Sequence, residues 1–157
     1  MAEKPRVTPE TWNIEEMLTL PENTFGYQYA LFMDSHGYTS AERPLVKYVP
    51  NLEDAYILQR YKEVHDTVHV LLGYGTSVSE EIAVKWFEMM QTGLPMSALA
   101  AFIGPLNLVF MARDKQNVDN LAKVYLPHIM SNAKTSRMFM NVYYERHFET
   151  PIDDLRT

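Results

Sequence analysis

The residues of this chain best suited to chemistry are two histidines and an aspartate in one short segment: His65, Asp66 and His69. Residues four apart share a face of an α-helix, so the two imidazoles would point to the same side. Asp66 lies between them around the axis, and Glu81 follows after eleven intervening residues. Imidazoles and carboxylates in this spacing predict a divalent-metal site, with all four residues as candidate ligands and candidate catalytic groups.

Other interpretations of this motif stay open from the sequence alone. With five histidines in the chain, one such pair can arise by chance and merely flank a helix. A metal phosphohydrolase would also use an adjacent His–Asp pair, but the further candidates His36, His128 and Asp119 form no recognisable pattern. The motif is similar to the His-Glu-x-x-His of zinc proteases, except that an aspartate follows the first histidine. This shorter acid suits ligation or orientation better than the role of a protease base.

The composition describes one globular domain over residues 1–157, of which 1–12 are expected to be loose. Hydrophobic residues make up 46% and charged residues 22%, which is typical of a chain with a sizeable core. A net charge of −6 without a basic run argues against nucleic acid as a partner. The chain has no cysteine, so any metal ligands must be His, Asp or Glu. The ten methionines are interpreted mainly as core-filling residues.

The apolar pattern predicts an all-α fold, a helical bundle with the metal motif on a long central helix. No alternating strand pattern and no internal repeat is present. We expect helices over residues 12–20, 24–35, 51–72, 78–91, 118–131 and 139–148. An irregular connection is expected over 37–50.

The central helix and the helix after it have recognisable boundaries. Asn51 is the expected N-cap of the first, and a Gly-Tyr-Gly break at residues 73–75 ends it. Ser77 and Glu80 match a capping box for the following helix. Glu80 is then used by the cap, which leaves Glu81 to lean back toward the two histidines.

Residues 89–112 contain no charged side chain. A membrane span needs about 20 continuous apolar residues in one helix, whereas Pro95, Gly104 and Pro105 divide this stretch. We therefore expect a buried helix followed by an apolar loop. The alternative is an apolar groove or a membrane-contact surface beside the metal site.

Several sequence blocks around the motif resemble one known family. They are Tyr-Lys-Glu-Val at 61–64, Glu-Ile-Ala-Val-Lys-Trp at 81–86, Gln-Thr-Gly-Leu-Pro-Met at 91–96, Gly-Pro-Leu at 104–106 and Asn-Val-Tyr-Tyr-Glu-Arg at 141–146. With the intact His-Asp-x-x-His, eleven residues, then Glu, they resemble the fourth COQ protein of ubiquinone (coenzyme Q) biosynthesis, in its mitochondrial form. Members begin with a transit peptide and a further helical segment. The first residues here, Met-Ala-Glu-Lys-Pro-Arg, are neither, so the chain is similar to an N-terminally trimmed core.

The resemblance implies a peripheral protein on the matrix side of the mitochondrial inner membrane, working with other COQ proteins, with a homodimer as a further expectation. It implies oxidative decarboxylation of a polyprenylated hydroxybenzoate, in which a hydroxyl replaces the carboxyl group at ring carbon 1. The alternative is a non-catalytic, lipid-binding scaffold. Zinc is the expected metal, with iron, manganese or magnesium as alternatives; zinc cannot change oxidation state and would act as a Lewis acid.

Such a substrate has an anionic head and a long apolar tail, and each part needs contacts in the protein. The candidate substrate-binding residues are Met96, Phe102, Ile103, Arg60, Lys85 and Tyr144. The first three would line the path of the tail, and the cations would hold the carboxylate. Arg137 and Arg146 are further candidates for the carboxylate. All the cations are also compatible with ordinary surface charge, and the tyrosine with simple packing.

Overall fold

The protein is described by a computed structural model that covers residues 3–39, 41, 43–106, 108–109 and 115–156. Every extended regular element within these residues is helical, and the only β-type pairing among them is an isolated bridge between Thr24 and Pro151. The all-α prediction is therefore confirmed. The chain divides into two compact units, Met1–Leu71 with Met140–Thr157 and Leu72–Phe139.

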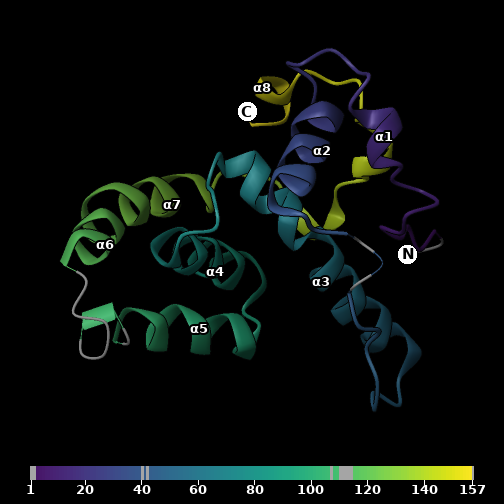
Figure 1. The fold of residues 1–157 in the computed structure, drawn as a ribbon. Coiled ribbons are helices and arrows are strands. Elements are labelled where there is room, and N and C mark those ends of the chain that lie inside the picture. The colour runs from purple at the N-terminus through teal and green to yellow at the C-terminus, as the bar shows by residue number, and fades with distance from the viewer. Residues whose placement is uncertain (1–2, 40, 42, 107, 110–114, 157) are drawn as a thin grey trace. The chain divides into compact units, whose positions relative to one another are not determined.

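The first unit is built on α1 (Ile14–Met17), α2 (Phe25–His36) and α3 (Leu52–Leu72, apart from its last residue), with the short C-terminal α8 (Ile152–Leu155) (Figure 1). The predicted boundaries of α2 are confirmed. Its N-cap Thr24 accepts a hydrogen bond from the backbone N–H of Tyr27. It ends at Gly37, whose φ of 65° is left-handed and costs a glycine little strain.

Helix α3 carries the metal motif, and its predicted span is also confirmed. The Asn51 side chain accepts a hydrogen bond from the Glu53 N–H at 2.8 Å, which caps the helix as expected. Tyr61, Val64 and Val68 are buried and form its apolar stripe. The two histidines flank this stripe, so the core of the first unit fixes the face on which they lie.

The N-terminal segment is anchored to the first unit although its described residues, from Glu3 on, form no helix before Ile14. The Val7 N–H donates to Glu63 Oε2 at 2.9 Å, and both side chains are buried. Trp12 packs edge-on against Tyr29, with ring centroids 4.6 Å apart. The expectation that residues 1–12 are loose is thus wrong for the part around Val7 and Trp12. The carboxylate and aromatic surface that hold it come from α3 and α2, which a local reading of the sequence does not reveal.

The second unit contains α4 (Val78–Thr92), α5 (Pro95–Leu106) and a continuous helical stretch formed by α6 (Lys115–Asn120), a π-helical turn (Leu121–Tyr125) and α7 (Leu126–Asn132). Helix α4 contacts α5 as well as α6 and α7, and is the central helix of this unit (Figure 1). The predicted helix over 118–131 lies inside the helical stretch, which starts earlier and contains a π turn.

Helix α4 begins as the sequence predicts. The Ser77 N–H donates to Glu80 Oε2 at 3.2 Å, as in a capping box, and the Gly75 N–H donates to Glu80 Oε1 at 2.9 Å. The carboxylate of Glu80 is therefore used at the start of the helix. Glu81, the next residue, is left for another role.

The expectation of a buried apolar helix within residues 89–112 is wrong. In α5 only the small residues Ser97 and Ala101 are buried. The large apolar side chains Met96, Leu99, Phe102, Ile103 and Leu106 are each more than half exposed. Small residues allow the close approach to α4, since a Cβ on Gly104 would lie only 2.7 Å from Ile82 Cγ1. No helix among the described residues is both long and apolar enough to cross a membrane.

The predicted helix over 139–148 is also not observed. This segment forms two short 3₁₀ turns, Phe139–Asn141 and Tyr144–Arg146. The backbone carbonyl of Val142 accepts a hydrogen bond from Arg60, and the Tyr144 side chain is buried. Long-range contacts therefore replace the internal hydrogen bonds of a helix here.

Candidate metal centre

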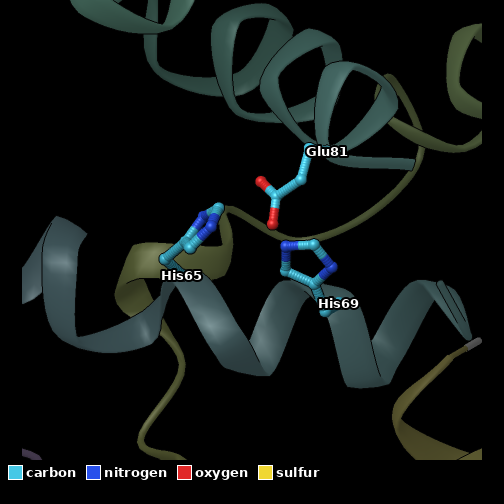
Figure 2. Close-up of side chains that lie close together, drawn as sticks. All are labelled: His65, His69 and Glu81. Atoms are coloured by element: carbon cyan, nitrogen blue, oxygen red, sulfur yellow. The ribbon is translucent and has the colours of Figure 1, made fainter. Parts of the chain in front are cut away.

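Three of the four predicted metal ligands lie together. One nitrogen of His65, one nitrogen of His69 and one carboxylate oxygen of Glu81 are all within 4.8 Å of one another. Figure 2 shows both imidazoles rising from α3, with the Glu81 carboxylate directed toward them from α4. Ligand atoms about 2.0–2.2 Å from one zinc ion lie roughly 3–4 Å apart, so small side-chain adjustments would close this group around an ion.

The chemistry of this group fits a borderline divalent metal. Two imidazoles and one carboxylate form a complete protein ligand set for catalytic zinc, and they also suit non-haem iron or manganese. His69 is buried, whereas His65 and Glu81 are half-buried. The Phe32 ring stacks on the His69 imidazole at a centroid distance of 5.6 Å, which restrains its plane. The group thus combines a rigid buried ligand with an accessible side.

Asp66, the fourth predicted ligand, has a different partner. Arg43 Nη2 forms an ion pair with Asp66 Oδ2 and donates a second hydrogen bond to the Tyr29 hydroxyl at 3.2 Å. Burial lowers the pKa of Arg43, but the neighbouring Tyr29 and Asp66 raise it, and the net shift is upward. The guanidinium therefore remains charged. The role of Asp66 as a direct metal ligand stays a prediction, and the observed contact is with Arg43.

Arg60 and Tyr144, two of the candidate substrate-binding residues, are held within the first unit. Arg60 donates from Nη1 to Glu145 at 2.7 Å and from Nη2 to the Val142 carbonyl at 3.0 Å. Its guanidinium also lies over the Tyr144 ring, 6.0 Å from the centroid. Burial raises the pKa of the Tyr144 phenol far above its usual range, and the nearby positive charge of Arg60 only partly opposes this shift. These contacts describe packing and pairing within the protein.

The other candidate cations have partners or lie at the surface. Lys85 Nζ donates to the buried Glu88 at 2.8 Å. Arg146 pairs with Glu3 at 2.8 Å, and Arg137 is exposed. Met96, Phe102 and Ile103 lie on the exposed apolar face of α5 described above. The substrate-binding roles of these residues stay predictions.

The additional ligands that a phosphohydrolase would need do not join the group of three. His36 Nδ1 is hydrogen-bonded to the Phe32 carbonyl, and His128 Nδ1 is hydrogen-bonded to the Tyr74 hydroxyl. Asp119 pairs with Lys123 at 3.1 Å. Within the described part of the chain, His65, His69 and Glu81 form the only group of three or more such side chains that could hold a metal ion.

Arg43 is the residue near this site that the sequence analysis missed. It lies in an irregular connection, and its partner Asp66 is 23 positions away. Neither helical periodicity nor a motif links the two. Asp66 could have indicated such a partner, because a half-buried carboxylate needs a nearby cation or hydrogen-bond donors.

Together, the fold and the site define a class, the all-helical proteins with a candidate two-histidine, one-carboxylate metal centre. Residues 1–157 match the model of a family described as coenzyme Q (ubiquinone) biosynthesis protein Coq4. The chain therefore belongs to the Coq4 family, and the family resemblance deduced from the sequence is confirmed.

Curated relatives agree with this assignment. The chain is 53% identical over 154 residues to the mitochondrial ubiquinone biosynthesis protein COQ4 homolog 2 of Paramecium tetraurelia, covering 98% of this chain and 71% of that protein. It is 48% identical over 154 residues to the mitochondrial COQ4 homolog of Nematostella vectensis, covering 98% and 73%. For the mitochondrial COQ4 homolog of Homo sapiens, identity is 38% over 156 residues, covering 99% of this chain and 57% of the human protein.

A solved structure shares the fold. The crystal structure of a putative ubiquinone biosynthesis protein from Nostoc punctiforme superposes with a TM-score of 0.78 at 21% sequence identity. The match covers 99% of this chain and 70% of that one. At this identity the likeness supports the helical fold and carries no argument about activity.

Proposed function

We propose that this chain acts in ubiquinone biosynthesis as a metal-dependent enzyme that replaces the ring carboxyl group of a polyprenylated hydroxybenzoate with a hydroxyl. The observation that carries this proposal is the group formed by His65, His69 and Glu81, whose ligand atoms lie within 4.8 Å of one another. Family membership supplies the pathway, and the ligand group supplies a reason to expect catalysis.

In the proposed reaction the three side chains would hold the ion, as three protein ligands do in catalytic zinc sites. When bound, the ion would supply Lewis-acid polarisation of the oxygen substituents on the aromatic ring. Zinc fits the ligand set best, and iron, manganese or magnesium are the alternatives. His69 is fixed by burial and by the Phe32 ring, so it would set the position of the ion.

The apolar tail of the proposed substrate has a suitable host in α5. Met96, Phe102 and Ile103 are each more than half exposed, and no charged residue interrupts this helix. Exposed apolar patches of this kind mark lipid or protein contact surfaces. We propose that this face meets the isoprenoid tail at the surface of the inner mitochondrial membrane, on the matrix side, since the relatives carry mitochondrial names.

The same exposed face favours a second candidate function, that of a non-catalytic scaffold. Other COQ proteins, or a second copy of this chain, would cover α5, and the metal would only fix the helices. Arg60 and Lys85 pair with Glu145 and Glu88, which suits a protein that does not use these cations on a substrate.

Turnover decides between the two functions. The purified chain, reloaded with zinc, iron or manganese in turn, is given a carboxylated polyprenyl hydroxybenzoate under ¹⁸O₂ with a two-electron reductant such as ascorbate, because incorporation of one oxygen atom leaves the other to be reduced to water. Loss of the carboxyl group with gain of one labelled oxygen, followed by mass spectrometry, is the result expected of the enzyme. Binding without turnover under every metal would favour the scaffold.

The α5 face gives a separate prediction. Replacing Phe102 and Ile103 with serine should weaken binding of a long-chain polyprenyl hydroxybenzoate in micelles by about tenfold or more. Full burial of each side chain contributes about 1.5–3 kcal/mol, and 1.4 kcal/mol corresponds to tenfold. The control is Val124→Ser, which removes an equally exposed apolar residue from another part of the second unit. Equal affinities of the two variants would exclude the α5 face as the binding surface for the polyprenyl tail.

A further inference from the structure

Arg43 is a largely buried cation that the described contacts leave incompletely satisfied. Its side chain is only 13% exposed, and its Nη2 is used twice, by Asp66 and by the Tyr29 hydroxyl. Its Nη1 is buried and has no hydrogen-bond partner among the described residues. A guanidinium has several N–H donors in a fixed geometry. A buried charged donor without a hydrogen-bond acceptor is unfavourable. An acceptor from outside the described residues would therefore stabilise Arg43 Nη1.

The surroundings of Arg43 connect it with the metal centre. Asp66, its ion-pair partner, directly follows His65 on α3. Tyr29, its other partner, lies one turn of α2 before Phe32, the residue that stacks on His69. Both contacts thus come from helices that also position the two imidazoles. A ligand on Nη1 would be held by the same packed elements as the candidate metal ligands.

We propose that Arg43 binds the carboxylate of the substrate through Nη1. A carboxylate is the acceptor best matched to a guanidinium, because its two oxygens accept charge-assisted hydrogen bonds. Asp66 contacts Nη2 alone, so the donors on Nη1 remain for a further acceptor. The inference rests on the proposed function and deepens it, because the carboxyl group is the part that the proposed reaction removes.

The competing explanation is that Arg43 serves only to neutralise Asp66. The two explanations differ in what Asp66→Asn does. If Arg43 only balances the charge of Asp66, then Arg43→Gln and Asp66→Asn both disturb the same local packing and weaken the binding of all ligands alike. If Arg43 binds the substrate carboxylate, Asp66→Asn removes a competing carboxylate and leaves the guanidinium in place. Binding of an acid should then be retained or strengthened.

The test uses the zinc-loaded chain and two matched probes. They are a 4-hydroxybenzoate with a geranyl chain and the corresponding phenol that lacks the carboxyl group. Dissociation constants are measured by calorimetry for the unmodified chain and for Arg43→Gln, Arg43→Lys and Asp66→Asn. Zinc affinity and the circular dichroism spectrum of each variant are recorded alongside, so that loss of metal or fold is detected.

The unmodified chain should prefer the acid to the phenol by about tenfold or more, the range of a charge-assisted hydrogen bond. Arg43→Gln should abolish this preference by weakening the acid alone. Arg43→Lys should restore part of it, because the charge remains but the planar fork is lost. Asp66→Asn should bind the acid at least as tightly as the unmodified chain.

Three outcomes would overturn the inference: no preference for the acid in the unmodified chain, an unchanged preference in Arg43→Gln, or equal losses in Arg43→Gln and Asp66→Asn. The labelled-oxygen experiment is scored separately. Arg43-dependent binding of the acid without turnover would leave this inference standing while the proposed reaction fails. Turnover with binding that does not depend on Arg43 would do the reverse.

Discussion

His65→Ala is expected to lower zinc affinity by more than about 100-fold while leaving the helical content unchanged. Outer partners of metal ligands typically contribute 10–100-fold, and a direct ligand should contribute more. His65 is half-buried, so its removal opens no large cavity in the core of the first unit. Competition with a chromophoric chelator gives the affinity, and circular dichroism gives the helical content.

The matched control is Asp66→Asn, on the adjacent residue. The ion pair of Asp66 with Arg43 and its position outside the group of three predict a smaller loss, at most about the 10–100-fold that is typical of an outer partner. Equal losses in the two variants would mean that Asp66 ligates the metal directly. Zinc affinity unchanged by His65→Ala would remove the metal centre from the proposed function.

Glu145→Ala is expected to destabilise the first unit by about 3 kcal/mol. Removing one partner of a buried ion pair lowers the free energy of unfolding by about 3–5 kcal/mol. The lower end applies here because the Glu145 side chain is 20% exposed. Arg60, only 1% exposed, would be left with the Val142 carbonyl and the Tyr144 ring. Thermal unfolding should show a midpoint lower by about 6–12 °C.

Asp119→Ala is the control for this effect. Its salt bridge with Lys123 is exposed on both sides, and surface pairs contribute about 0–1 kcal/mol. A loss of stability in Glu145→Ala no larger than in Asp119→Ala would contradict the structural role of Arg60. In that case Arg60 would again be a candidate for binding the substrate.

The parts of the fold that the sequence predicted best have local causes. Thr24 and Gly37 bound α2, Asn51 caps α3, and the Ser77–Glu80 capping box begins α4; each acts within a few residues of the backbone it stabilises. The i, i+4 spacing of the two histidines is equally local. These features follow from helix geometry and needed no knowledge of the tertiary structure.

The errors have long-range causes. Val7 and Trp12 are held by residues of α3 and α2. Arg60 donates a hydrogen bond to the carbonyl of Val142, which lies 82 positions away in the sequence. The orientation of α5 was wrong because hydrophobicity alone assigns large apolar residues to the interior. The small residues Ser97 and Ala101 occupy it instead. Arg43, the ion-pair partner of Asp66, was missed because it lies 23 positions away in an irregular connection.

The two-part composition of the first unit has a consequence for synthesis on the ribosome. Its helices α1 to α3 are translated before the second unit, whereas Tyr144 and Ile152, which are buried in the same first unit, are translated after it. The Arg60–Glu145 contact spans 85 positions, and such distant pairings form late. The second unit is continuous in sequence and can complete its packing first. Nascent chains would thus expose the unfinished apolar surface around α2 and α3 while the second unit is being translated, and this is where we expect chaperones to bind.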